Sequence, residues 1–266
     1  MELYIVLILG AIAALFVISS FLPAQTKILI TRFFPFDTNG FDTYRNLLEK
    51  KFYYFSLLTP DEQREFVFRL KSIRSSKSFV GRGIHVTDEM EILVSAALAQ
   101  LTFGLEKFAL LKFESIHITP ESFYSSLIGR KVKGLTFESG RMILSWADFV
   151  QGYKTGNDKI NLALHEMAHA IMLDNPTYDE IDFHFEDWEK TTLLELHRNR
   201  NTENILFLRD YAFTNKDELW ACCVECFFEA PVDFKESLPA TYNKMCLILK
   251  QDMAQRMAAC RTGVNS

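Results

Sequence analysis

The sequence predicts an α+β fold that is mostly helical and has a small mixed sheet, preceded by one N-terminal transmembrane helix. Two observations predict the fold class. Most of the chain shows apolar residues at helical spacing between capping residues, whereas residues 113–146 show short apolar runs separated by Pro and Gly. With 266 residues and 48% hydrophobic content, the chain has enough apolar material for a large core.

The first segment is a continuous apolar run. Leu3 to Leu22 contains no charged side chain and ends before Pro23, and about 20 apolar residues span a bilayer core. The N-terminus carries Glu2 instead of the basic region of a signal peptide, so we expect an uncleaved anchor over residues 1–22. Basic residues lie only on its C-terminal flank, which predicts a single-pass membrane protein with the rest of the chain in the cytoplasm.

Charge and cysteine content exclude two broad classes of protein. Acidic residues exceed basic residues by only 34 to 29, and no basic stripe with interleaved aromatic residues is present, so we expect no nucleic-acid binding. The five cysteines are an odd number, and most of them lie in helical patterns. A secreted disulfide framework is therefore not expected, and a reducing compartment fits better.

Residues 23–110 are predicted to form an N-terminal helical part. Thr59 and Glu62 have the spacing of a capping box and begin one helix. Thr87 begins another, whose residues 90–103 are apolar enough to be mostly buried.

Residues 111–266 are predicted to form the catalytic part, and residues 23–266 together are expected to be one compact unit. Short strands are expected first, and the strand at residues 141–146 could either bind an extended peptide by strand addition or be an ordinary half-buried strand. Helices follow, with capping residues at their starts and Pro after some of their ends. They are expected over residues 157–173, 179–198, 215–229 and 241–259.

The residues that carry chemistry lie in the first of these helices. His165 and His169 are four residues apart and share one helix face, so both imidazoles can bind a single zinc ion. Glu166 projects beside such an ion and can accept a proton from a nucleophilic water. The apolar flanks indicate a buried helix, in which two histidines and a glutamate without partners would be unfavourable. We therefore expect a metal site and not a pair of core histidines.

A catalytic zinc site needs a third protein ligand and one open position. Glu218, Cys222 and Glu225 share one face of a later helix, and all three are candidates. Glu218 has a second interpretation, because Asn215-x-x-Glu218 is also the spacing of a capping box. Cys222 is more simply a small hydrophobic residue of that helix, and Glu225 fits better as a residue that braces a ligand.

Three blocks of sequence together resemble the family of zinc-dependent peptidases typified by Mlc titration factor A, whose catalytic region is related to anthrax lethal factor protease. Because the blocks occur in the family's order, they are more specific than the His-Glu-x-x-His motif alone. The blocks are Ser145-Trp-x-Asp-Phe149, Asn161-Leu-x-Leu-His-Glu-x-Ala-His-Ala170 and Tyr211-Ala-x-x-Asn-x-x-Glu-x-x-Ala221.

The resemblance implies a zincin-like catalytic domain of the gluzincin type. It implies that Glu218 is the third zinc ligand and that Tyr211 donates a hydrogen bond to the transition state. The expected activity is zinc-dependent hydrolysis of a peptide or protein substrate by a domain anchored to the membrane. The family also includes a factor that sequesters a transcriptional repressor. The alternative is therefore a regulatory binding protein with a weak or vestigial peptidase site and a regulatory protein as its partner.

Overall fold

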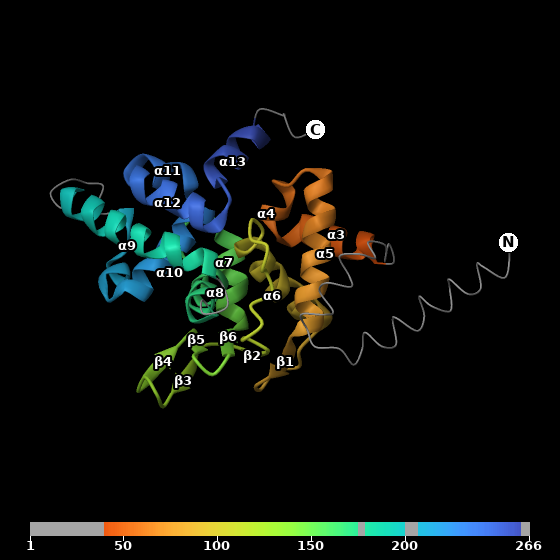
Figure 1. The fold of residues 1–266 in the computed structure, drawn as a ribbon. Coiled ribbons are helices and arrows are strands. Elements are labelled where there is room, and N and C mark those ends of the chain that lie inside the picture. The colour runs from red at the N-terminus through yellow and green to blue at the C-terminus, as the bar shows by residue number, and fades with distance from the viewer. Residues whose placement is uncertain (1–39, 175–178, 200–206, 262–266) are drawn as a thin grey trace. The chain divides into compact units, whose positions relative to one another are not determined.

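Two of the first helices that the structure describes begin at the caps that the sequence contains. The computed structural model describes residues 40–174, 179–199 and 207–261 (Figure 1). The Thr59 hydroxyl accepts from the Glu62 amide at 3.3 Å, and the Glu62 carboxylate accepts from the Thr59 amide at 2.8 Å, which confirms the capping box. Thr87 caps the next long helix, also as predicted. The two capped helices are α5 (Pro60–Ser76) and α6 (Asp88–Leu101), and they follow α3 (Phe41–Lys51) and α4 (Tyr53–Ser56).

A mixed sheet and a separate hairpin occupy the region where short strands were predicted. Across the sheet the order is β1 (Ser78–Gly81), β2 (Ser115–Thr119), β6 (Arg141–Ser145) and β5 (Gly134–Phe137). The first three strands are parallel, and β5 is antiparallel to β6. The hairpin consists of β3 (Phe123–Ser125) and β4 (Arg130–Val132).

The position of β6 corrects one prediction. Its neighbours β2 and β5 pair with it on both sides, so β6 has no free edge for the strand addition that we considered. The edge strand on this side of the sheet is β5. Trp146 does not continue β6 but begins α7, because the Ser145 hydroxyl accepts from the Asp148 amide and caps that helix.

The second half of the described chain is helical. Its elements are α7 (Trp146–Thr155), α8 (Leu162–Asp174), α9 (Asp179–Asn199), the short 3₁₀ helix η3 (Asp210–Phe213), α10 (Lys216–Glu229), α11 (Pro231–Ser237), α12 (Pro239–Leu249) and α13 (Met253–Arg261). The single helix expected over residues 241–259 is two helices, because Lys250 adopts a left-handed conformation with φ of +50° between α12 and α13.

Helix α8 begins later than predicted, at Leu162 instead of near residue 157. Gly156 ends α7 in the left-handed conformation, and Lys159 is also left-handed, with φ of +63°. The side chain of Asn161 then accepts from the Leu164 amide at 3.2 Å and caps α8. Two left-handed residues therefore separate α7 from α8, and the cap lies immediately before the histidine motif.

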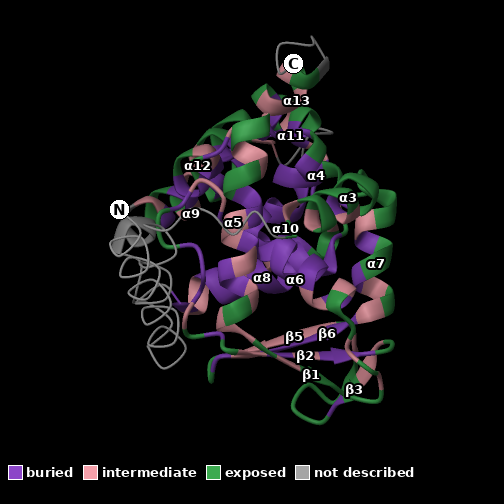
Figure 2. Cartoon of the chain, turned by 90° about the vertical axis from the view of Figure 1, so that its right-hand side faces the viewer, coloured by how far each residue is buried: buried purple, intermediate pink, exposed green. Residues whose placement is uncertain are grey.

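The core lies where α8 packs between the sheet and α10. Figure 2 shows α6, α8 and α10 as the most completely buried helices, with the sheet beneath them. Trp220 of α10 is fully buried, donates from Nε1 to the Ala168 carbonyl of α8 at 3.1 Å and packs edge-on against Trp188 of α9. The described residues from 42 to 261 belong to one compact unit. The prediction of a mostly helical α+β fold with a small mixed sheet is confirmed.

The predicted membrane anchor, residues 1–22, lies outside the described residues. Among the residues that the structure does describe, no helix combines the length and the apolar character needed to cross a bilayer. This finding corrects the prediction of a single-pass membrane protein, to which the structure gives no support.

Trp220→Ala tests the contact between α8 and α10. Removal of this buried ring and of its hydrogen bond should lower the free energy of unfolding by about 3–5 kcal/mol, measured by urea denaturation. Leu247→Ala is the control, because the Leu247 side chain on α12 is 50% exposed and its loss should change stability by less than about 0.5 kcal/mol. Equal effects of the two substitutions would contradict the importance of this packing.

Candidate metal centre

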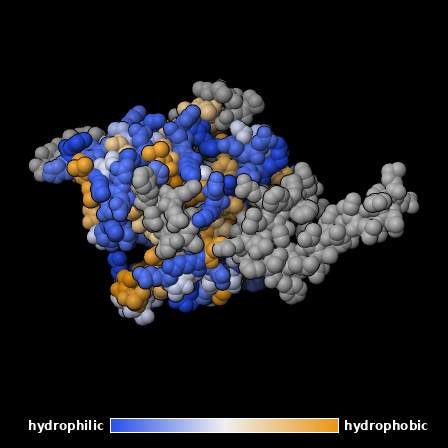
Figure 3. Space-filling model, in the orientation of Figure 1, coloured by the Kyte–Doolittle hydropathy of each residue, from blue (hydrophilic) through white to orange (hydrophobic). Residues whose placement is uncertain are grey.

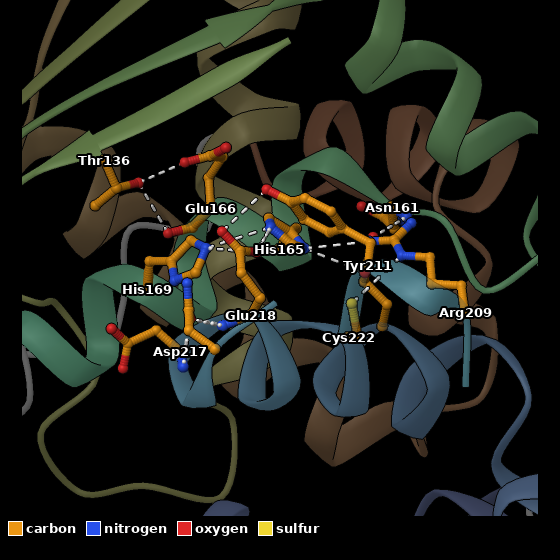
Figure 4. A network of polar contacts seen from close by, with 12 residues as sticks. Thr136, Asn161, His165, Glu166, His169, Arg209, Tyr211, Asp217, Glu218 and Cys222 are labelled. Carbon is orange, nitrogen blue, oxygen red and sulfur yellow. Dashed lines mark hydrogen bonds and ion pairs between the residues drawn. The ribbon is translucent and has the colours of Figure 1, made fainter. Parts of the chain in front are cut away.

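Three potential metal-ligand atoms converge where α8 meets α10 (Figure 4). His165 and His169 lie one turn apart on α8, and their Nε2 atoms are 3.2 Å apart. Glu218 belongs to the first turn of α10. Its Oε2 atom is 3.0 Å from His165 Nε2 and 3.5 Å from His169 Nε2. The packing of two helices therefore brings together residues that are about fifty positions apart in the sequence.

The separations and the chemistry of these atoms suit a metal ion. Two imidazole nitrogens and a carboxylate oxygen are common zinc ligands. Ligands about 2.0–2.1 Å from a tetrahedral ion lie about 3.3 Å from one another, close to the separations of 3.0, 3.2 and 3.5 Å found here. Glu218 Oε2 is buried and, apart from its contacts with the two histidines, has no hydrogen-bond partner in the described part of the chain. This oxygen is therefore available to a cation.

The Glu218 carboxylate does not complete a capping box at the start of α10. The Asn215 side chain accepts from the amides of Asp217 and Glu218, both at 2.9 Å, and so caps α10. A full capping box would also require the Glu218 carboxylate to return to the Asn215 amide. That carboxylate instead faces the two histidines. Burial raises the pKa of Glu218, but the contacts with His165 and His169 outweigh this effect, so the pKa lies below its ordinary value.

The other two candidate ligands lie on the opposite side of His165. Glu225 Oε2 is 3.2 Å from His165 Nδ1, and Arg209 donates from Nη2 to the same carboxylate oxygen. Arg209 also donates from Nε to the Cys222 sulfur at 3.3 Å. Of the three candidates, Glu218 alone contacts both His165 and His169. Glu225 is placed to orient the imidazole ring from outside.

Glu166 lies against the edge strand of the sheet. It is only 6% exposed, and Thr136 of β5 donates from Oγ1 to its Oε2 at 2.7 Å. A Cβ atom at Gly134 would lie 2.4 Å from Glu166 Oε1, so only glycine leaves room for this carboxylate. Burial raises the pKa of Glu166, although His165, His169 and Thr136 favour its charged form. A raised pKa increases the ability of a carboxylate to accept a proton near neutral pH.

Tyr211 lies at the mouth of the site, on η3. The residue is 39% exposed, and its hydroxyl donates to Glu218 Oε1 at 3.0 Å. Burial and the nearby Glu218 carboxylate raise the pKa of Tyr211, so its hydroxyl keeps its proton at neutral pH. The structure thus places all five residues singled out in the sequence in one site.

A cleft of about 460 Å³ leads to this site. Its lining includes His165, Glu166, Arg209 and Tyr211, together with residues of α7 and of the chain from β4 into β5. The volume falls within the range of about 300–1,000 Å³ that is typical of ligand pockets. The cleft therefore has room for a few residues of an extended peptide.

Sequence reasoning missed several residues that support the site. Gly134 and Thr136 were recognised only as part of a strand region, and Arg209 carried no signal at all. Asn161 could have been found, because Asn161-x-x-Leu164 has the spacing of a helix cap. Its backbone amide donates to Glu225 Oε1 at 2.9 Å. Asn161 therefore also links the start of α8 to Glu225, the residue that contacts His165 Nδ1.

Comparison with known proteins identifies relatives over about half of the chain. Mlc titration factor A of Salmonella arizonae is 29% identical over 138 residues, which cover 47% of this chain and 53% of the relative. The proteins of the same name from Salmonella agona and Salmonella paratyphi B are each 28% identical over 138 residues, with 47% of this chain and 50% of the relative covered. The chain thus spans about half the length of the curated relatives it matches.

A family model covers more of the chain. The model described as glucose-regulated metallo-peptidase M90 matches residues 37–250, a range that contains both histidines of α8 and Glu218 of α10. The resemblance inferred from the three sequence blocks is therefore confirmed. The chain belongs to the glucose-regulated metallo-peptidase M90 family.

Proposed function

We propose that the protein is a zinc-dependent metallopeptidase, with a zincin-like domain of the gluzincin type, that hydrolyses peptide bonds in a peptide or protein substrate. Membership in a metallopeptidase family supports hydrolase activity and metal binding. The observation that carries the proposal is the convergence of His165, His169 and Glu218 beside the buried carboxylate of Glu166. A purely structural metal site has no use for a base in that position.

His165, His169 and Glu218 would hold the zinc ion. Three protein ligands leave one position open, as catalytic zinc sites require. When bound, zinc lowers the pKa of a coordinated water to about 7 and polarises a carbonyl group. Glu225 and Arg209 hold the His165 ring from its Nδ1 side, which directs Nε2 toward Glu218.

Glu166 is proposed as the general base. Thr136 fixes the carboxylate at the edge of the sheet, and burial raises its pKa. It would accept a proton from the attacking water and then return that proton to the leaving amine. Tyr211 would turn its hydroxyl from Glu218 to the carbonyl oxygen of the substrate, which gains negative charge in the transition state.

The edge of β5 supports an extended conformation for the substrate. Within the described residues β5 pairs with β6 alone, so its other edge can accept a peptide strand. Gly134 and Thr136 of this strand adjoin Glu166. A peptide bound at this edge would therefore pass close to the proposed base.

A regulatory binding protein is the second candidate function. The name of the relatives, Mlc titration factor A, favours it, because a titration factor acts by binding its partner. In that case the chain would sequester a partner such as a transcriptional repressor, and its peptidase site would be weak or vestigial. The buried Glu166 and its hydrogen bond from Thr136 favour catalysis.

Glu218→Ala tests the third ligand. The variant should lose most of its zinc, because a site with two protein ligands is much weaker. Glu225→Ala should lower zinc affinity less, by about 10–100-fold, because Glu225 only orients His165. Inductively coupled plasma mass spectrometry of the purified proteins measures both effects. Equal zinc content in Glu218→Ala and the parent would reject the assignment.

Glu166→Gln tests the reaction itself. The parent protein, loaded with zinc, should cleave an unstructured fluorogenic peptide and lose this activity with a chelator. Glu166→Gln keeps the size of the side chain but removes the base, so kcat should fall by about 10²–10⁴-fold while zinc content stays the same. If the fully loaded parent cleaves no member of a peptide library, the regulatory candidate is favoured.

Tyr211→Phe separates transition-state stabilisation from support of the ligand. If the hydroxyl donates to the substrate oxygen, its loss should reduce kcat by about 10²–10³-fold and leave zinc content and KM nearly unchanged. If the hydroxyl mainly holds Glu218, with which it bonds in the structure, zinc content should fall as well. Unchanged kcat and zinc content would remove Tyr211 from the mechanism.

A further inference from the structure

One wall of the cleft is basic. It is formed by β4 and the residues that lead from it into β5, which the chain supplies as Arg130, Lys131, Val132, Lys133 and Gly134. Three of these five residues carry a cationic side chain, and none carries an acidic one. The β3–β4 hairpin projects at the lower left of Figure 1, so a peptide entering from this side meets the cationic wall.

Two of these cations have no ionic partner of their own. Lys133 Nζ lies 2.8 Å from a carboxylate oxygen of Asp148 on α7, so its charge is balanced. Arg130 and Lys131 are exposed and form no ion pair within the described residues. Arg130 and Tyr211 line the same cleft.

The acidic residues that line the cleft form no ion pair with Arg130 or Lys131. Glu225 is paired with Arg209 and is 1% exposed, and Asp148 is paired with Lys133. Glu166 is buried against Thr136. Asp158 also carries a negative charge, and its carboxylate accepts from the Ile160 amide at 3.0 Å. Arg130 and Lys131 are therefore exposed cations of the cleft wall whose charges are not tied up in an ion pair with these carboxylates.

We infer that Arg130, assisted by Lys131, binds a carboxylate of the peptide substrate. Arginine matches the planar geometry of a carboxylate with two parallel hydrogen bonds, and exposed cations on the cleft wall attract an anionic group. The inference rests on the proposed peptidase function and names its substrate class: peptides with an acidic side chain, or a free C-terminal carboxylate, near the cleaved bond.

The space-filling surface agrees with a binding role for this hairpin. Tyr124, Leu127 and Ile128, which lie on β3 and in the turn, are exposed by 70%, 74% and 44%. Hydrophobic surface is visible at the place of the hairpin in Figure 3. The chain thus presents apolar groups at the end of the hairpin and cations at the cleft, a combination suited to holding a peptide.

The test uses peptides that differ at a single position, which is Asp, Asn or Lys, each with a free or an amidated C-terminus. We expect the zinc-loaded full-length protein to show about fivefold higher kcat/KM for the Asp peptide than for the Asn peptide, the upper range for an exposed ion pair. If the site instead binds the C-terminal carboxylate, amidation of the C-terminus should lower kcat/KM by a similar factor. Replacement of Asp by Asn in the peptide should then leave kcat/KM unchanged.

Substitutions assign the preference to Arg130. Arg130→Gln should bring the Asp to Asn ratio close to one, and Arg130→Glu should shift the preference to the Lys peptide. Arg64→Gln is the matched control, because Arg64 is exposed on α5, pairs with Asp61 and does not line the cleft. It should keep the parent's ratio. A salt increase from about 0.1 M to about 1 M should reduce the preference, since the Debye length falls from about 10 Å to about 3 Å.

Binding gives a readout that does not depend on turnover. Fluorescence anisotropy with labelled peptides and the Glu166→Gln protein should show the same acidic preference, and Arg130→Gln introduced into that protein should remove it. Equal binding and equal cleavage of the Asp, Asn and Lys peptides would overturn the carboxylate site and leave the peptidase intact. Acid-selective binding that needs Arg130, with no cleavage by the parent, would keep the carboxylate site and reject the peptidase.

Discussion

A buried carboxylate holds the site together. Glu225 is 1% exposed, and burial of a charge is strongly unfavourable unless hydrogen bonds compensate it. The compensation comes from the Asn161 amide, His165 Nδ1 and the Arg209 guanidinium. These groups belong to the start of α8, to its first histidine and to the segment before η3. One side chain of α10 thereby fixes the cap of α8 and the direction of the His165 ring.

The packing of α8 against α10 extends this arrangement from one side chain to the whole site. Trp220 fills the interface and bonds to the backbone of α8 one residue before His169. Glu218, two residues before Trp220 on α10, is thereby held within 3.5 Å of both histidines. Rigid helices position such groups better than loops do, because their side chains cannot shift without disturbing the core.

The sheet positions the Glu166 carboxylate and provides one wall of the cleft. Its edge strand β5 lies beside α8, and the absence of a side chain at Gly134 gives space to the Glu166 carboxylate. Thr136, two residues later on the same face of the strand, binds that carboxylate. The chain that leads into β5 carries the cations of the cleft wall. The position of the Glu166 carboxylate, the free strand edge and the cationic wall therefore all depend on the short stretch that includes β4 and β5.

The sequence by itself determined the local features. Capping residues and the period of apolar residues predicted the helix starts at Thr59, Thr87 and Asn215, and four-residue spacing placed His165 and His169 on one face. The same patterns could not place the start of α8, where two left-handed residues intervene, or show that β6 is interior to the sheet. Spacing left Glu218, Cys222 and Glu225 equivalent, because a helix face is wide. Only the packing of α10 on α8 decided which of them faces both histidines, since contacts between distant segments depend on tertiary structure and not on local pattern.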